Sequence, residues 1–231
     1  MSLFEARIEL IREDGVKVPA LRMTPEFEAA AKLNGAGVVV VGGERGLGDE
    51  EYARILTPLC DHGYFVVALD LVRGGAVTSD EEAEKLAAAL DHSIAIDDLV
   101  AGILTCKQVA AGKIGVIGIG AAAAVALEGA TQLPHIDCVV HVDGPPPAKS
   151  ARLARLRASL LIHRASEGRL LSKADCDDIA ARAERSRAPI VTYDYPTRDG
   201  FFAHPRNDDE AFHSRVAWDR TRDFLSTALV G

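Results

Sequence analysis

The sequence has little that would tie it to a membrane, to nucleic acid or to an oxidising compartment. No apolar run approaches the roughly 20 residues that a membrane-spanning helix requires. The opening residues, MSLFEARIEL, lack the basic and then apolar layout of a signal peptide. The formal net charge is −8, and acidic and basic residues are interspersed. Because nucleic acids and anionic membranes favour clustered lysine and arginine, neither is an expected partner.

Cysteine is scarce and dispersed. The four cysteines are Cys60, Cys106, Cys138 and Cys176, with no close pair and no metal-type spacing with histidine. We therefore expect a reduced, cytoplasmic protein without a metal or other cofactor. Cys106 and Cys138 are expected to be buried small apolar residues.

The composition is that of one globular domain. The 231 residues, 48% of them hydrophobic, are enough to bury a three-layer core. No repeat, low-complexity tract or linker divides them, and GPPP at 144–147 is a stiff loop inside the fold. We expect a single domain over residues 1–231, present as a monomer or homodimer.

The hydrophobic pattern predicts a hairpin followed by alternating strands and helices. Residues 4–10 and 16–23 alternate between apolar and polar side chains, with Glu13-Asp14-Gly15 as the turn between them. Residues 38–41 are all valine, which is typical of a strand covered on both faces. We predict further strands at 65–69, 113–117, 138–142, 159–163 and 189–193, helices at 49–62, from 79, and at 94–109, 121–129, 173–185 and 209–229, and a surface connection at 24–37.

This order predicts a doubly wound, mostly parallel α/β sheet with an antiparallel hairpin at its edge and helices on both faces. Ligands of such sheets bind beyond the carboxyl ends of the strands. The loops of interest therefore begin at Gly42, Asp70, Gly118, Asp143, Arg164 and Asp194.

Four segments, in this order, resemble the dienelactone hydrolase family. They are GERGL at 43–47, HGYFVVALDLVRG at 62–74, KIGVIGIGAAAAVAL at 113–127, and DGFFAHPR at 199–206 followed by AWDRTRDFL at 217–225. The third has the strand–turn–helix form of that family's nucleophile elbow. The resemblance spans residues 4–229 and implies an α/β-hydrolase-like fold.

The sequence departs from the family at the catalytic positions. The family's elbow reads Gly-x-Cys-x-Gly-Gly, and its cysteine attacks an ester or lactone carbonyl, but the matching position here is Gly120. Asp199 stands where the family has a histidine before Gly-Phe. Gly168, with Glu167 beside it, matches the family's aspartate. Only the turn glutamate is retained, as Glu44.

A glycine at the elbow changes the expected chemistry. Covalent acyl transfer needs a thiolate or alkoxide, and Gly120 has no side chain. Glycine adopts positive φ without steric cost, so the turn should persist. The helix that follows can direct the amides of Ala121 and Ala122 at a carbonyl or carboxylate oxygen. We expect a pseudoenzyme that binds a small anionic or carbonyl-containing ligand.

The residues expected around this ligand fall into two sets. Those with acid or base chemistry are Glu44, Asp199 and His204, and those that would bind are Gly120, Ala121, Arg45, Arg73 and Arg206. Each also has a structural interpretation. Glu44 can cap loop amides, Asp199 can form a turn with Gly200, and Arg73 and His204 can be solvated surface groups. His141 and His163 fall in strands and are expected to be hydrogen-bonded in or near the core.

Two other functions remain open. An active ester or lactone hydrolase could use a water activated by Glu44 or Asp199, with His204 replacing the lost histidine. Alternatively, Gly118-x-Gly120-x-x-Ala123 fits a dinucleotide-binding fingerprint, with Asp143 at the end of the next strand. That fingerprint usually opens its domain, whereas this run lies in the middle of the chain.

Overall fold

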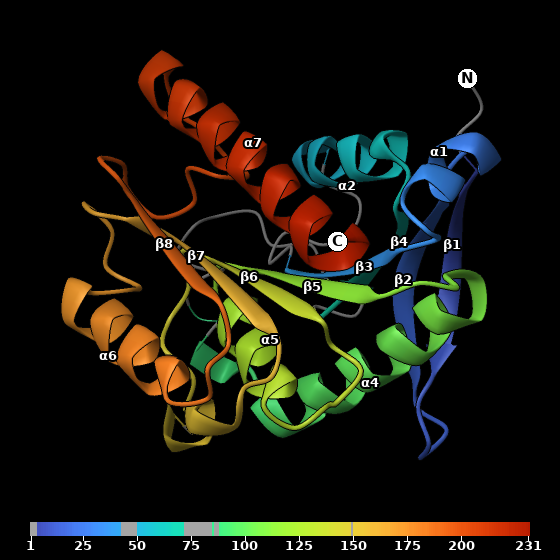
Figure 1. The fold of residues 1–231 in the computed structure, drawn as a ribbon, viewed down its shortest axis with the longest axis horizontal. Coiled ribbons are helices and arrows are strands. Elements are labelled where there is room, and N and C mark those ends of the chain that lie inside the picture. Colours follow the sequence, from blue (N-terminus) through green and yellow to red (C-terminus); the bar gives the residue numbers. More distant parts are fainter. Residues whose placement is uncertain (1–3, 43–49, 72–84, 86–87, 149) are drawn as a thin grey trace.

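The structure is a computed structural model that describes residues 4–42, 50–71, 85, 88–148 and 150–231 (Figure 1). Its centre is an eight-stranded sheet in the order β1-β2-β4-β3-β5-β6-β7-β8. The strands are β1 (Phe4–Ile11), β2 (Lys17–Thr24), β3 (Gly37–Gly42), β4 (Phe65–Asp70), β5 (Ile114–Ile119), β6 (Cys138–Val142), β7 (Ser159–Ala165) and β8 (Ile190–Tyr195). The helices are α1 (Phe27–Lys32), α2 (Glu50–His62), α4 (His92–Val109), α5 (Ala122–Ala130), α6 (Lys173–Glu184) and α7 (Asp208–Val230), with a 3-10 turn η1 (Ser150–Arg155).

The predicted edge hairpin is confirmed. β1 and β2 pair antiparallel from Phe4 with Thr24 to Ile11 with Lys17, and Gly15 takes a positive φ of 80° in the turn between them. β2 also pairs antiparallel with β4, and every later pair in the sheet is parallel. The predicted mostly parallel α/β sheet with an antiparallel hairpin at its edge is therefore present.

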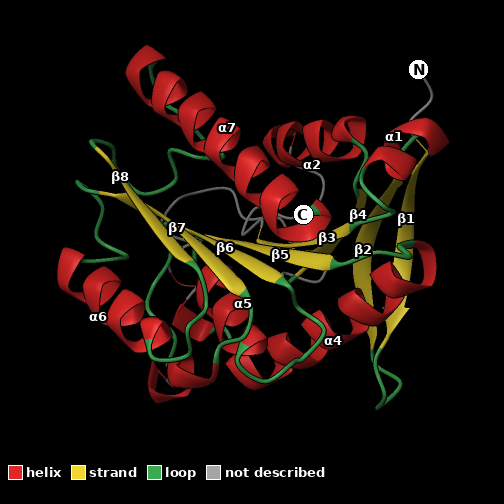
Figure 2. Ribbon diagram, viewed as in Figure 1, coloured by secondary structure: helices red, strands yellow, loops and turns green. Residues whose placement is uncertain are grey.

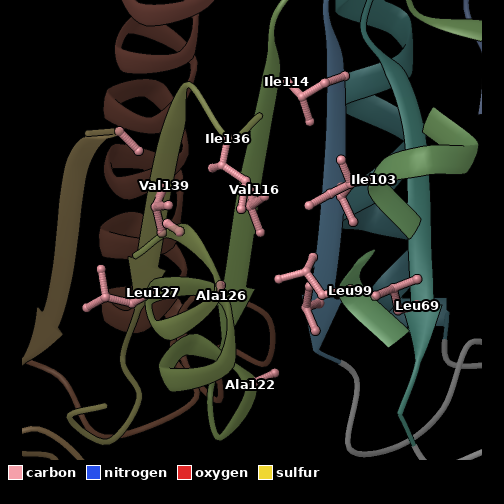
Figure 3. Close-up of a cluster of buried hydrophobic side chains, with 14 of the residues drawn as sticks. Leu69, Leu99, Ile103, Ile114, Val116, Ala122, Ala126, Leu127, Ile136 and Val139 are labelled. Carbon is pink, nitrogen blue, oxygen red and sulfur yellow. The ribbon is translucent and has the colours of Figure 1, made fainter. Parts of the chain in front are cut away.

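Helices cover both faces of the sheet, as Figures 1 and 2 show, with α1, α2 and α7 on one face and α4, α5 and α6 on the other. Strand β3, with valine at residues 38–41, is buried throughout and contributes side chains to both hydrophobic layers. Val39 and Val41 join the cluster beneath α4 and α5, and Val38 and Val40 join the cluster beneath α2 and α7. Figure 3 shows the first cluster, in which Leu99 and Ile103 of α4 pack against the strands.

The strand order places the elbow at the switch point of the sheet. β3 lies between β4 and β5, so the chain adds β4 on one side of β3 and then crosses over to add β5 on the other. The carboxyl ends of β3 and β5, Gly42 and Ile119, therefore lie at the edge of the sheet where open α/β sheets bind ligands.

One predicted connection contains a helix. Residues 24–37 were expected to form only a surface connection, but α1 occupies Phe27–Lys32 within them. Alanine, glutamate and lysine are strong helix formers, and a six-residue helix is too short to show a helical repeat in the sequence. The helix predicted from Ser79 lies outside the described residues. In the described part of the chain, no helix is both long and apolar enough to cross a membrane.

Candidate functional site

The turn between β5 and α5 has the expected elbow form. Gly120 adopts φ +58°, the left-handed region that glycine enters without a steric penalty. Its N–H donates to the carbonyl of Val142 at 2.9 Å, and its own carbonyl accepts from the N–H of Ala123 at 3.0 Å. The turn is thus fixed to the end of β6 on one side and to the first turn of α5 on the other.

Small residues allow the elbow to pack this closely. A Cβ on Gly118 would lie 2.6 Å from the Cα of Ala123, and a Cβ on Gly144 would lie 2.1 Å from the Gly120 carbonyl oxygen. All the residues of α5 are buried. Close packing of β5 against α5 therefore explains why Gly118 and Ala123 of the fingerprint-like run are small residues. Dinucleotide binding stays a prediction.

Ala121, the predicted oxyanion-binding residue, is the N-cap of α5. It is 7% exposed and, as an alanine, supplies no side-chain cap to the first turn of the helix. The helix dipole places partial positive charge at this end of α5. The predicted start of a helix directly after Gly120 is therefore present, and ligand binding there stays a prediction.

Asp143 is a residue of this site whose importance the sequence did not reveal. It follows β6 with a positive φ of 47° and is 2% exposed. Its carboxyl oxygens accept the N–H of Ala165 at 3.2 Å and of Gly200 at 2.8 Å. Burial, and then the neighbouring charge of Asp199, raise the pKa of Asp143 from 3.8 to about 6. The available signal was an acid directly after a buried strand and before GPPP.

Asp199 lies near Asp143, and its charge contributes to the raised pKa of that residue. The Asp199 carboxylate also accepts the N–H of Arg169 at 2.7 Å and of Leu170 at 3.3 Å. A Cβ on Gly168 would lie 2.1 Å from Oδ1 of Asp199. The two positions matched to the family's histidine and aspartate are therefore in contact, as a base and the group that orients it must be.

His204 and Arg206 follow Asp199 in the same loop. The N–H of His204 donates to the carbonyl of Gly200 at 2.8 Å, and its side chain is half-buried. The Arg206 guanidinium donates to the Asp199 carbonyl at 2.7 Å and to the buried carboxylate of Glu210 at 3.0 Å. Arg206 therefore braces the loop against α7.

The remaining predicted site residues, Glu44, Arg45 and Arg73, lie outside the described residues. Within the described ranges, no group of three or more His, Cys, Asp or Glu side chains has an arrangement suited to a metal ion. The site as described consists of the elbow and the loops that follow β6, β7 and β8.

The two strand histidines are core residues, as predicted. Nδ1 of His163 lies 2.9 Å from the Tyr195 hydroxyl, and its Nε2 lies 2.9 Å from Oγ1 of Thr221. Nε2 of His141 lies 3.2 Å from the Pro145 carbonyl, while its Nδ1 has no partner among the described residues. Burial lowers the pKa of His163 to about 3 and that of His141 to about 4, so both are neutral near pH 7.

The buried cysteines are also as predicted. Burial raises the pKa of Cys106 to about 12 and raises the pKa of Cys138 further still. Cys60 and Cys176 are buried as well, and the pKa of each is raised by burial. Because the thiolate is the reactive form, none of the four is suited to act as a nucleophile.

Comparison with known families decides the assignment. Residues 21–229 match the model of the dienelactone hydrolase family, which is most of the chain. The chain belongs to the dienelactone hydrolase family. A search of curated proteins found no match.

Solved structures of this and related hydrolases share the fold. A Klebsiella pneumoniae protein assigned as a dienelactone hydrolase has a TM-score of 0.80 at 16% identity, covering 96% of this chain and 97% of its own. A dienelactone hydrolase-like promiscuous phosphotriesterase from metagenomic libraries has a TM-score of 0.82 at 14% identity, covering 99% and 100%. An esterase of Pyrococcus furiosus has a TM-score of 0.71 at 18% identity, covering 99% and 94%. At these identities the likeness establishes the fold alone.

Proposed function

We propose that this member of the dienelactone hydrolase family binds a small anionic or carbonyl-containing ligand at the elbow and does not hydrolyse esters through a covalent intermediate. The observation that carries the proposal is the left-handed glycine at position 120, which matches the family's nucleophile. The backbone of an elbow is retained, but the atom that would attack a carbonyl carbon is missing.

The surroundings of Gly120 support binding of an oxygen with negative or partial negative charge. α5 begins directly after the turn, so its dipole and first-turn amides are directed toward this end of the sheet. The names of the related structures describe an esterase and a phosphotriesterase, whose substrates carry such oxygens. In this proposal Glu44, Arg45 and Arg73 complete the site from the neighbouring loops.

The four buried cysteines support the absence of a covalent step. Each thiol has a raised pKa, and none replaces the missing nucleophile at the elbow. A hydrolytic reaction would have to use water directly, activated by Glu44 or Asp199 with help from His204. That alternative predicts turnover, whereas the present proposal predicts binding alone.

Binding is tested by thermal denaturation with a small panel of probes. Acetate, succinate and γ-butyrolactone represent the two ligand classes, and NAD, NADP and FAD represent the dinucleotide alternative. A ligand that binds only the folded state stabilises it by about 2.7 kcal/mol at a hundred times its Kd. We expect a carboxylate or the lactone to raise the melting temperature and the dinucleotides to leave it unchanged.

Two variants locate the bound probe. Asp and Asn both tolerate positive φ better than most residues, so Gly120→Asp and Gly120→Asn are sterically matched. Asp adds a negative charge at the start of α5 and should abolish binding of a carboxylate, while Asn should retain more of it. Equal shifts in wild type and both variants would place the ligand elsewhere. No shift with any carboxylate or lactone would contradict the proposal.

A further inference from the structure

The loop after β7, residues 166–172, is joined to the loop after β8 in two different ways. In its first part the two backbones pair. The N–H of Ser166 donates to the Tyr195 carbonyl at 2.7 Å, and the N–H of Glu167 donates to the Thr197 carbonyl at 3.0 Å. The two amides that follow Gly168 donate to a side chain instead. A side chain therefore continues what the backbone pairing begins.

That side chain is the carboxylate of Asp199. Its Oδ2 accepts the N–H of Arg169 at 2.7 Å, and its Oδ1 accepts the N–H of Leu170 at 3.3 Å. Successive backbone N–H groups directed at one point form a concave anion-binding site, known as a nest. Because an N–H group can only donate, both contacts favour the ionised carboxylate.

Gly168 makes the room that this carboxylate occupies. A Cβ on Gly168 would lie 2.1 Å from Oδ1 of Asp199 and 2.9 Å from its Cγ. A residue with a side chain at position 168 would therefore displace the carboxylate. The backbone of residues 168–170 thus has both the donors and the open space that a carboxylate requires.

The segment that carries the carboxylate is also connected to the elbow. The N–H of Gly200 donates to the Asp143 carboxylate at 2.8 Å. Asp143 directly follows the residue whose carbonyl accepts the Gly120 N–H. Asp199 and Gly200 are therefore bonded to the loop after β7 on one side and to the end of β6, beside the elbow, on the other.

We propose that the backbone of residues 168–170 is a carboxylate-binding nest, and that Asp199 fills it as a tethered ligand and so holds the loops after β7 and β8 together beside the elbow. Asp199 is then a positioning residue, because its two oxygens bind backbone amides. Its carboxylate is used to shape the site and not to transfer protons. The nest concerns the loops alone, so it holds whether or not the elbow binds the ligand proposed above.

The wild-type contact is measured directly by NMR. In protein labelled with 13C and 15N, a scalar coupling across a hydrogen bond connects the amide nitrogen of the donor to the carbon of the accepting group. We expect such a coupling between the Arg169 amide and the Asp199 carboxyl carbon. Its absence would overturn the proposal.

The variant Asp199→Gly removes the tethered ligand and leaves the nest. We expect the amides of Arg169 and Leu170 to exchange with solvent about tenfold faster than in the wild type, because each loses a hydrogen bond to a charged group. The Glu167 amide is the internal control, since it donates to a backbone carbonyl and should keep its rate. Unchanged exchange at both amides of the nest would overturn the proposal.

Formate, a carboxylate without a tether, tests the nest itself. We expect it to restore slow exchange of the Arg169 and Leu170 amides in Asp199→Gly, with chloride at equal ionic strength as the control. In the wild type it should leave both amides unchanged, because the nest is filled. Formate bound at the elbow would instead shift the amide signals of Ala121 and Ala122, so the two proposals fail separately. Formate that slows neither amide in the variant would contradict a carboxylate-binding nest.

The variant Gly168→Ala keeps Asp199 and closes the space. We expect it to speed exchange of the same two amides, and the double variant with Asp199→Gly to have no larger effect, since both changes remove one contact. Gly129→Ala, in α5, is the matched control and should leave both amides unchanged. Additive effects would contradict the shared contact. If Asp199→Gly does not fold, the wild-type coupling and Gly168→Ala decide.

Discussion

At the scale of single residues, Gly120 supplies the backbone turn of the elbow but no side chain that could react. Its φ of +58° is one that a non-glycine residue adopts at a cost of about 1–2 kcal/mol. A catalytic nucleophile at such a turn has to be held there by the rest of the fold. Glycine carries no such strain and has no side chain, so the turn forms here without a nucleophile at this position.

The reactivity of the elbow can be restored to test whether its geometry survives. We expect iodoacetamide to label Gly120→Cys in the folded state and to leave the wild type unlabelled, because the four natural thiols are buried with raised pKa values. Intact-mass spectrometry measures the added label. Labelling of wild type at the rate of the variant would show that another thiol is accessible, and a variant that misfolds would indicate a wrong match to the family's elbow.

The residue that the sequence did not identify as part of the site shows why side-chain contacts are hard to predict. From the sequence, Asp143 is only the start of a loop of interest and the acid of the fingerprint-like run, because its partners Ala165 and Gly200 come from the end of β7 and the loop after β8. By contrast, Gly120 and Ala121 lie within one local motif, and the predicted turn before a helix is present there. Motifs that are contiguous in the chain can be predicted from the sequence, whereas contacts among separate loops become visible only in the folded structure.

At the scale of elements, the close approach of β5 and α5 determines how the elbow is built. Every residue of α5 is buried, and its helix contains six alanines or glycines in addition to its larger apolar residues. A Cβ at Gly118 would meet the backbone of Ala123 and the short side chain of Ala126, neither of which can move aside. The strand and helix therefore fix the turn between them.

A pair of glycine substitutions tests this packing. We expect Gly118→Ala to destabilise the protein by about 1–3 kcal/mol, because its Cβ would lie 2.6 Å from both the Ala123 Cα and the Ala126 Cβ. Gly129→Ala is the control within α5, where the new Cβ meets the flexible end of Leu99 and alanine favours the helix. It should stay within about 1 kcal/mol of wild type. Urea denaturation measures the free energy of unfolding of both variants. An equal loss in the two would contradict the close approach of β5 and α5.

The elements were more predictable than the site. The valine run of β3 and the alternating strands of the edge hairpin are predictable, because burial on one face or both leaves a direct pattern in the sequence. The short helix α1 was missed, because six residues do not complete two helical turns. The boundaries of β5 and β7 extend two residues beyond their predicted ends, as far as Ile119 and Ala165.

At the scale of the whole molecule, the chain has the fold of the dienelactone hydrolase family, with a glycine at the turn between β5 and α5. The family model covers residues 21–229, and solved relatives cover nearly all of the chain at identities of 14–18%. The sheet order, the switch point beside β3 and the elbow are all retained. Such a combination is expected if the fold now serves to bind a ligand.

The most direct measurement is the turnover of p-nitrophenyl acetate by the purified wild-type chain. We expect the rate to equal that of the heat-denatured protein at the same concentration, with no burst of p-nitrophenol, because Gly120 cannot form an acyl-enzyme. Saturable turnover that is lost in both Glu44→Gln and His204→Ala would contradict the account and establish hydrolysis by displaced residues.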